Sequence, residues 1–441
     1  MAEAARDTIC AVSTAPGRAA IAVIRVSGAH ASHALRALAS EPLPSPRVAT
    51  VRQLKNADGD TIDQALVLWF PEPASATGED VVEFHLHGGR AVLDAVLHAL
   101  ASVPGLRAAE AGEFTRRSVE NGKLDLTRAE ALADLIDAET PAQQRQALRQ
   151  YQGALAELYE DWRSRLVSAL AWAEAAIDFS DEDLPADLEQ RLRVPVQSLR
   201  AEMQRHLDDS RRGEITREGL FLTIIGAPNA GKSSLVNALA RRDIAIVSEI
   251  PGTTRDILET RLDVAGHVVH VADTAGLRET SDAIESEGVR RALARAAASD
   301  MTLLVLDGSA RDPFAGLDKD AVANAALRVW NKSDLPWRAP RGGMRISATT
   351  GAGLDTLLTS LAAEIRKRLE RPREAAPMTR ARHRESVAAA FEALSRALGQ
   401  SESELMAEDL RLALRAIGRL TGRVDIEELL DTVFRDFCIG K

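Results

Sequence analysis

The sequence predicts a multidomain chain that combines α+β and α/β architecture, in which an inserted α/β domain interrupts a helical one. Its 441 residues suggest about three domains of roughly 150 residues each. Short β-branched runs are confined to residues 1–120 and 217–370. The stretches 121–216 and 371–441 show helical periodicity instead.

The N-terminal stretch, residues 1–120, predicts an α+β domain. The runs TICAVS, AIAVIRVS, ALVLWF and VVEFHLH are rich in strand-forming residues and are separated by turn clusters. One amphipathic segment between them has apolar residues at helical spacing, namely Leu93, Val96, Leu97 and Leu100.

Residues 121–216 predict helices. Thr127 and Glu130 have the spacing of a capping box, so we expect a helix to begin there. A longer apolar stripe follows on one side of the helical stretch, formed by Leu148, Tyr151, Leu155, Leu158 and Trp162.

The alternating segment, residues 217–370, predicts a parallel or mixed sheet with helices on both faces, because strand-like and helical runs take turns along it. The helical pattern then returns in residues 371–441, where Leu410, Leu414 and Ile417 share a face. The simplest interpretation is one helical domain whose chain is interrupted by an insertion. Two separate helical domains are the alternative.

Composition limits the function classes. The chain has 55 Lys and Arg against 65 Asp and Glu, a net charge of −10, which argues against a general nucleic-acid coat but leaves room for a local basic patch. Its two cysteines, Cys10 and Cys438, exclude a disulfide framework and a four-thiolate metal site. With no long uncharged apolar run and no signal-peptide pattern, we expect a cytoplasmic protein without a membrane span.

A phosphate-binding loop is predicted between the apolar run LFLTII and the helical run SLVNALARR. Residues 226–233, GAPNAGKS, match the P-loop pattern in the strand–loop–helix context that it requires. Lys232 is expected to reach the β- and γ-phosphates and Ser233 to ligate Mg²⁺. A glycine-rich turn without a ligand is the alternative. The expected nucleotide contacts here are Asn229, Ala230, Gly231, Lys232, Ser233 and Ser234.

Three further motifs close strand-like runs. Asp273 can hold the Mg²⁺ shell, and Asp334 of the run NKSD can accept hydrogen bonds from guanine N1 and N2, which adenine cannot supply. In their order, the motifs resemble a guanine-nucleotide-binding domain of the GTPase superfamily. The expected contacts are Asp273, Thr274, Ala275, Gly276, Asn331, Lys332, Asp334, Ser347, Ala348 and Thr349.

A switch segment is expected at residues 252–256, GTTRD, where Thr254 would complete Mg²⁺ coordination. A pair of capping threonines in a loop is the alternative. Leu277 occupies the position at which many GTPases have a water-orienting Gln, and no residue is recognisable as an arginine finger. Water positioning and charge compensation must therefore come from elsewhere.

The resemblance to one family extends along the chain. It is carried by PNAGKSSLVNAL, IPGTTRD, DTAGLRET and the terminal FCIGK, residues 437–441. The N-terminal runs APGRAAIAVIRVSG, TGEDVVEFHLHGG and AGEFTRRSVENGKLDL also take part. With these runs, essentially all 441 residues resemble the MnmE (TrmE) family of tRNA-modifying GTPases.

This resemblance implies a K⁺-activated GTP hydrolase whose G domains dimerise across their nucleotide faces. The K⁺ ion would supply the charge of the missing arginine finger. Glu285 would match the family's catalytic, water-orienting glutamate, although its spacing alone favours a solvated helix charge. The implied K⁺ site comprises Asn229, Ser248, Ile250 and Thr253, and the implied nucleotide contacts of this loop are Ser248, Glu249, Ile250, Pro251, Gly252, Thr253 and Thr254.

The resemblance also implies that the N-terminal domain dimerises and binds a reduced folate, 5,10-methylene- or 5-formyl-tetrahydrofolate, through Arg25, Glu83, Lys123 and Lys441. Independently, VVEFHLH presents a polar strand face, and Arg25 interrupts an apolar run. An internal ion pair is the alternative for Arg25. A metal pair at His85 and His87 is a weaker alternative, because no third ligand is near.

The implied reaction joins the chain to an FAD-containing partner, MnmG (GidA), as a homodimer within a heterotetramer. Together they would install a (carboxymethyl)aminomethyl group at carbon 5 of the wobble uridine of certain tRNAs, with the carbon supplied by the folate. Cys438 would act near this chemistry, or it would be a small buried hydrophobe that docks the C-terminus.

Two other functions are considered. The first is an RNA-binding regulatory GTPase of the ribosome-assembly type, but the G-x-x-G loop of a KH domain is missing, since no two of the 28 glycines are three positions apart. The second is a stand-alone folate enzyme with a regulatory G domain, which the sequence leaves open.

Overall fold

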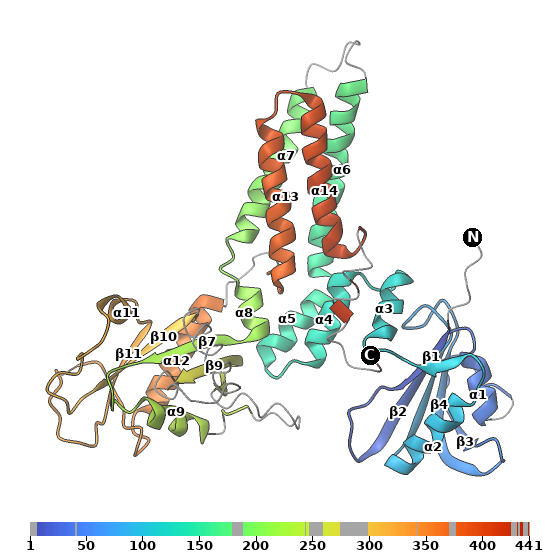
Figure 1. The fold of residues 1–441 in the computed structure, drawn as a ribbon, viewed down its shortest axis with the longest axis horizontal. Coiled ribbons are helices and arrows are strands. Elements are labelled where there is room, and N and C mark those ends of the chain that lie inside the picture. Colours follow the sequence, from blue (N-terminus) through green and yellow to red (C-terminus); the bar gives the residue numbers. More distant parts are fainter. Residues whose placement is uncertain are drawn as a thin grey trace, which may run out of the picture. The chain divides into compact units, whose positions relative to one another are not determined.

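The computed structural model describes residues 7–39, 42–178, 188–242, 244–246, 259–273, 299–340, 342–369, 376–424, 430, 433–434 and 440. They form two compact units, Met1–Ala133 with Leu414–Lys441 and Asp134–Ala413. Figure 1 shows that both units mix helices with sheet. The predicted multidomain α+β and α/β architecture is confirmed.

A six-stranded sheet of order β3-β4-β5-β2-β1-β6 forms the centre of the first unit. Its strands are antiparallel except for the parallel pair β1 and β6. The bounds are β1 (Thr8–Val12), β2 (Ala19–Ser27), β3 (Thr50–Lys55), β4 (Thr61–Phe70), β5 (Val81–Gly88) and β6 (Leu106–Ala108).

Helices α1 (Ala31–Ala39) and α2 (Arg90–Ala101) cover one face of this sheet. Their apolar residues share a core cluster with Ile24, Phe84 and Leu86 of the strands. The alternation predicted for β5 is confirmed, since Phe84 and Leu86 are buried in this core while Glu83 and His85 point to the opposite face. Two helices follow, α3 (Glu113–Glu120) and α4 (Leu126–Ile136).

The expected start of α4 at a Thr127 capping box is wrong. The carboxylate of Asp125 caps the helix, because its Oδ1 accepts hydrogen bonds from the backbone N–H of Thr127 at 2.9 Å and of Arg128 at 3.1 Å. Thr127 instead lies within the first turn and donates its hydroxyl to the same oxygen at 2.5 Å. Asx side chains are favoured at this position because they accept from free N–H groups.

The C-terminal residues return to the first unit. Leu430 and Phe434 pack with Leu126 of α4. Near the last residue, Ser13 Oγ donates to the carbonyl of Gly440 at 2.9 Å. A Cβ at Gly440 would lie 2.1 Å from the Val12 carbonyl oxygen, so only glycine permits this approach to β1.

The second unit contains a helical bundle, drawn at the top of Figure 1. Helices α6, α7 and α13 pack side by side, with α7 in contact with both others. Because α13 lies beyond the α/β part in the chain, this packing makes the helical domain discontinuous. The bounds are α5 (Pro141–Tyr151), α6 (Ala154–Asp178), α7 (Leu188–Leu207), α8 (Arg212–Glu218), α13 (Ala381–Gly399) and α14 (Ser403–Thr421).

The long stripe predicted from Leu148 to Trp162 does not lie on one helix. The chain turns between α5 and α6 at Gly153, whose φ of 106° lies in the left-handed region. Leu155 and Trp162 of α6 are buried, whereas Leu148 is 42% and Tyr151 37% exposed. The apolar periodicity therefore spans a helix break that it cannot reveal.

The α/β part is inserted between α8 and α13. Its six strands have the order β12-β11-β10-β7-β9-β8, and all described neighbours are parallel except β8 and β9. The bounds are β7 (Leu220–Ile225), α9 (Lys232–Ala240), β8 (Glu259–Val264), β9 (His267–Asp273), β10 (Met301–Asp307), α11 (Lys319–Ala323), β11 (Leu327–Asn331), β12 (Met344–Arg345) and α12 (Leu354–Leu369). No helix in the described ranges is both long and apolar enough to cross a membrane.

We expect the bundle to lose stability as the pH is lowered, because the buried His206 resists protonation. Its ring is 7% exposed and packs edge-on against Trp162, with 5.4 Å between centroids. Burial lowers the pKa of His206 to about 4, from an ordinary value of 6.5. Between these values the unfolded chain binds the extra proton, so acidification favours unfolding, by about 3 kcal/mol at pH 4. His206→Phe keeps the ring but does not titrate.

Urea unfolding of both proteins at pH 7, 6 and 5, followed by tryptophan fluorescence, measures this effect. The wild type should lose more stability than His206→Phe as the pH falls through that window. Parallel pH dependences of the two proteins would show that His206 is not the group responsible.

Candidate active site

The predicted P-loop joins β7 to α9. Gly231 precedes the helix with a φ of 91°, a value that L side chains rarely adopt. At the start of the loop, a Cβ on Gly226 would lie 2.3 Å from the Val305 carbonyl oxygen of the neighbouring strand β10. Glycines thus allow the loop to turn tightly between strand and helix, which leaves the N–H groups of the first turn of α9 available to an anion.

Lys232 begins α9 and is only 8% exposed. Its ammonium group donates to the carbonyls of Gly226 at 2.9 Å and Ala227 at 3.1 Å, so the side chain spans the loop. Phosphate oxygens are stronger acceptors than neutral carbonyls. A triphosphate in the loop would therefore compete well for this ammonium group.

Asn331 connects the two loops that the sequence assigns to phosphate and to guanine. Its Nδ2 donates to the Ala230 carbonyl at 2.9 Å, and its Oδ1 accepts from the backbone N–H of Ala348 at 3.0 Å. The side chain is 2% exposed. A Cβ on Gly231 would lie 2.3 Å from this Nδ2, so glycine is required where Asn331 crosses the P-loop.

The predicted guanine-binding residues lie around Asn331. Ser347 Oγ donates to Asp334 Oδ1 at 2.5 Å, which leaves the second carboxylate oxygen of Asp334 for the base. Lys332, with a φ of 63°, donates to Asp307 Oδ2 at 2.7 Å. Thr349 is exposed beside them.

Asp307 is a residue that the sequence reasoning missed. Burial alone would raise the pKa of this carboxyl group, but hydrogen bonds from Lys332 and Ser309 hold its pKa below the ordinary value. The ionised carboxylate fixes the Lys332 side chain beside the guanine-binding loop. A signal was present, since Asp307 closes an apolar strand just as Asp273 and Asn331 do.

Several predicted residues fall outside the described part. β9 ends at Asp273, whose backbone pairs with Ile224 at the end of β7, so the predicted Mg²⁺ carboxylate ends the strand next to the P-loop strand. Its side chain is not described. Ser233 and Ser234 lie in the first turn of α9. The predicted residues that lie wholly outside are Ser248, Glu249, Ile250, Pro251, Gly252, Thr253, Thr254, Thr274, Ala275, Gly276, Glu285, Cys438 and Lys441.

The residues present fit the groups that the motifs imply. The P-loop offers a cradle in which side chains at Gly226 and Gly231 would collide with neighbouring atoms. Ser233, in the first turn of α9, offers a hydroxyl oxygen, a hard donor of the kind that Mg²⁺ prefers. His85 bonds to Glu83 and His87 to Asp63, so the two histidines engage separate carboxylates. No group of three metal-ligating side chains is found among the described residues.

Two of the predicted folate contacts, Arg25 and Glu83, lie on the sheet face opposite α1 and α2. Arg25 and Glu83 are cross-strand partners, and Arg25 Nη2 donates to Glu83 Oε1 at 2.8 Å. The guanidinium also lies over the ring of Phe114, 5.8 Å from its centroid. The internal ion pair considered for Arg25 is therefore present. Both residues remain partly exposed, so the pair can face a ligand.

Lys123 is exposed and lies over the loop that precedes β5. Asn121 Nδ2 donates to the Thr77 carbonyl at 2.7 Å, and the Lys123 chain passes over Gly78, where a Cβ would lie 3.2 Å from its Cε. Arg117 of α3 holds the same loop through Glu79 at 3.1 Å. Arg117 also bonds Glu113, whose pKa falls to about 2 because its bonds to arginines outweigh its burial.

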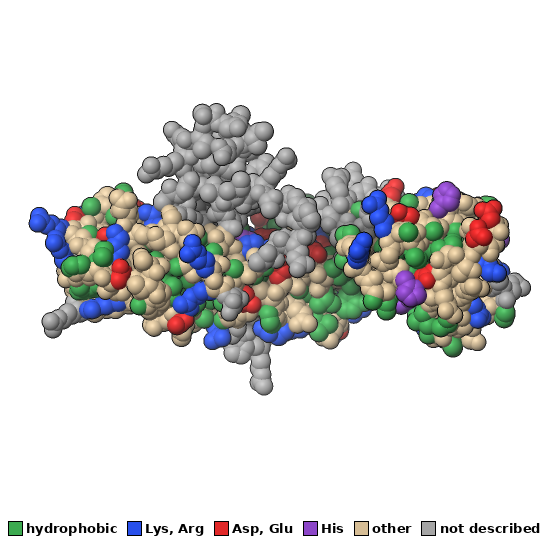
Figure 2. Space-filling model, turned by 90° about the horizontal axis from the view of Figure 1, so that it is seen from below, with side chains coloured by type: hydrophobic (Ala, Val, Ile, Leu, Met, Phe, Trp, Pro, Cys, Tyr) green, Lys and Arg blue, Asp and Glu red, His purple; other side chains and the backbone are tan. Residues whose placement is uncertain are grey.

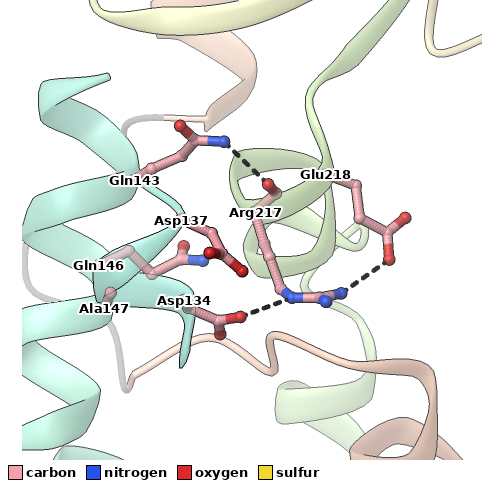
Figure 3. A pocket seen from close by; sticks show the side chains of 7 residues that line it. All are labelled: Asp134, Asp137, Gln143, Gln146, Ala147, Arg217 and Glu218. Carbon is pink, nitrogen blue, oxygen red and sulfur yellow. Dashed lines mark hydrogen bonds and ion pairs between the residues drawn. The ribbon is translucent and has the colours of Figure 1, made fainter. Parts of the chain in front are cut away.

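A polar cavity of about 130 Å³ lies where α8 leads into β7 (Figure 3). Arg217 Nε donates to Asp134 at 2.9 Å, and Gln143 donates to the Arg217 carbonyl at 2.9 Å. No predicted site residue lines it. The lining residues are Asp134, Asp137, Gln143, Gln146, Ala147, Arg217 and Glu218.

The β8–β9 hairpin connects the α/β part to α5 near this cavity. The backbone N–H of Ala142 donates to the Gly266 carbonyl at the hairpin tip, at 3.1 Å. Arg261 of β8 pairs with Glu139, just before α5, with 3.0 Å between Nη1 and Oε1. The hairpin lies in the chain between the two predicted switch segments, which are outside the described residues.

Asn331→Ala should weaken guanine-nucleotide binding. The change leaves the Ala230 carbonyl and the Ala348 N–H without their buried partner, at a cost of about 1–3 kcal/mol each. We expect at least a tenfold rise in the Kd for GDP, measured by fluorescent-nucleotide titration, with little change in helical circular dichroism. Asn324→Ala is the matched control, because Asn324 is exposed after α11. Equal affinities in the two variants would contradict the bridging role.

Comparisons with known proteins agree with this geometry. A family model described as "GTP-binding protein TrmE N-terminus" matches residues 8–123, and one described as "MnmE helical domain" matches residues 126–438. Proteins named "tRNA modification GTPase MnmE" are similar along nearly the whole chain. That of Parvibaculum lavamentivorans is 55% identical, covering 99% of this chain and all of its own, and that of Rhodospirillum rubrum is 55% identical over 99% of each. The chain belongs to the MnmE family of tRNA modification GTPases.

Proposed function

We propose that this GTPase acts with an FAD-containing partner to modify carbon 5 of the wobble uridine in certain tRNAs. The observation that carries the GTPase half is the buried Asn331 bridge, which ties a P-loop to a guanine-binding loop. The tRNA half is supported by the family to which the chain belongs. Within the proposed complex the chain is a homodimer bound to MnmG (GidA) as a heterotetramer.

The nucleotide would bind with its phosphates at the start of α9. Lys232 would exchange its loop carbonyls for phosphate oxygens, and Ser233 with Thr254 would hold Mg²⁺. Asp334 would accept hydrogen bonds from the guanine, with Lys332 fixed beside it by Asp307. We assign the remaining nucleotide contacts to the residues expected from the sequence.

Hydrolysis requires a positioned water and compensation of the developing charge. Glu285 would orient the water in place of the glutamine that Leu277 replaces. Bound K⁺ would supply positive charge beside the phosphates, held by Asn229, Ser248, Ile250 and Thr253. Of these four residues, Asn229 is described, and its φ of 61° places it at the turn of the P-loop.

The one-carbon unit would come from a reduced folate in the first unit, which when bound supplies a carbon at the oxidation level of formaldehyde or formate. Arg25 and Glu83 would contact its polar groups, with Phe114 beneath the guanidinium. Lys123 and Lys441 would complete the site. Gly440 packs on β1, which brings the C-terminus to the domain that holds the other three residues. Cys438 would lie near the same chemistry.

Loss of the gene should remove the wobble-uridine modification. In a deletion strain, nucleoside mass spectrometry of total tRNA should show unmodified uridine that a wild-type copy restores. A Lys232→Ala copy should fail, since the P-loop would lose its buried ammonium group. A Lys319→Ala copy, changed at an exposed lysine of α11, should restore the modification.

Unchanged nucleosides in the deletion strain would refute the proposed reaction. If ribosomal precursors accumulated there instead, the alternative of a ribosome-assembly GTPase would be favoured.

GTP turnover should depend on potassium. At equal ionic strength, we expect kcat in KCl to exceed kcat in NaCl by roughly 10²-fold, comparable to the loss of one preorganised charge-stabilising group. Asn229→Gly suits the positive φ of this position and removes the proposed ligand, so it should abolish the difference. Equal wild-type turnover in the two salts would reject the role of the ion.

A further inference from the structure

Helix α5 presents an outer face that neither the nucleotide site nor the folate site uses. Its exposed residues recur at helical spacing and include two arginines, an aromatic ring and an aliphatic side chain. Residues 140–153, TPAQQRQALRQYQG, contain no Asp or Glu, in a chain with 65 acidic residues. The exposed positions of this face are Gln144, Arg145, Leu148, Arg149, Tyr151 and Gln152.

The two arginines of this face differ from neighbouring arginines in having no ion-pair partner among the described residues. Within the described ranges, no carboxylate or other acceptor lies within bonding distance of Arg145 or Arg149. By contrast, Arg217 pairs with Asp134, and Arg261 pairs with Glu139. Arg145 and Arg149 are four residues apart, so they project from the same side of the helix. Their charges are uncompensated on a protein whose net charge is −10.

An aromatic ring accompanies these charges. The chain has two tyrosines, and Tyr159 is fully buried, whereas Tyr151 is 37% exposed. Leu148 is 42% exposed beside it. At 100° per residue, Tyr151 lies on the opposite edge of the exposed face from Arg149, so the face carries its ring on one side and its charges on the other. Proteins hold a phosphate backbone with arginine and stack unpaired bases on exposed aromatic rings. Glutamine side chains add donors for phosphate or sugar oxygens.

The opposite side of α5 is held firmly. Thr140 and Gln143 form a capping box at its N-terminus. Gln146 donates to the Gly213 carbonyl at 2.8 Å, and Figure 3 shows Gln143 directed toward α8. The helix is therefore ordered by its inner face, and a partner on its outer face would not have to order it.

We propose that the outer face of α5 binds the tRNA backbone, with Arg145 and Arg149 on phosphates and Tyr151 against a base or sugar. This rests on the proposed function, in which tRNA is the substrate. Charge favours RNA over a protein partner, because Arg145 and Arg149 have no acidic partner among the described residues and the helix itself carries no Asp or Glu. Figure 2 shows Lys and Arg interspersed with Asp and Glu over the face in view, in contrast to the acid-free sequence of α5.

The test is tRNA binding by the full-length protein and its variants. Total tRNA is titrated in filter-binding assays from 50 to 300 mM KCl, with wild type, Arg145→Gln/Arg149→Gln and Tyr151→Ala. Each lost phosphate contact should flatten the slope of log K against log salt by about 0.7–0.9, so the double variant should lose about 1.5 and bind roughly tenfold more weakly at low salt. Tyr151→Ala should weaken binding several-fold without changing the slope.

Arg205→Gln/Arg366→Gln is the matched control, because it removes two exposed arginines from α7 and α12. It should retain the wild-type slope and affinity. GTP turnover without tRNA should be equal in all variants, since none of these residues touches the nucleotide site.

The possible outcomes distinguish an error in the assignment of tRNA binding to α5 from an error in the proposed function. If wild type binds tRNA and the α5 double variant binds it equally well, the assignment to α5 is wrong while the proposed function stands. If the double variant keeps tRNA affinity but no longer forms a complex with the FAD-containing partner, the face is a protein interface and the proposal fails. If the wild-type protein binds no tRNA, either alone or with that partner, the proposed function is wrong, and the assignment to α5 fails with it.

Discussion

The nucleotide site depends on one buried side chain that holds two loops in register. Asn331 ends β11 and reaches both the P-loop carbonyl of Ala230 and the N–H of Ala348. Without such a bridge, the phosphate loop and the guanine loop would be joined only through the sheet. Because both hydrogen bonds are shielded from water, loss of either leaves an unpaired polar group. This side chain thus fixes the spacing between the P-loop and the loop that follows β12.

The same domain is attached to the helical bundle at more places than its chain connections. The chain passes from the helical part into the α/β part through α8. In addition, the carbonyl of Gly266 at the tip of the β8–β9 hairpin accepts a hydrogen bond from α5, and Arg261 of β8 pairs with Glu139. These contacts are polar. A polar joint exchanges partners at lower cost than an apolar core, because each group can bond to water during the change.

Much of this arrangement could be predicted from the sequence. The glycines of the P-loop and the polar residues that end strands can be recognised in the sequence, because backbone geometry and hydrogen-bond chemistry allow few other residue types at those positions. Helix boundaries were harder. The stripe from Leu148 to Trp162 keeps its period across Gly153, and only the left-handed conformation there turns Leu148 and Tyr151 outward. Asp307 closes an apolar strand in the same way, but the sequence does not show its partner, because Lys332 lies 25 positions away.

The pairing of Arg25 with Glu83 shows why a structural and a functional interpretation of one residue need not compete. Inside a sheet, an unpaired guanidinium would be expensive, so Glu83 stabilises Arg25 before any ligand is considered. Yet the pair is not fully buried, because the side chains of Arg25 and Glu83 are 27% and 17% exposed. A pre-formed pair fixes the orientation of its remaining donors and acceptors. When a ligand meets groups that are already oriented, less binding free energy is spent on ordering those side chains. A small polar ligand, which makes few contacts, benefits most from this.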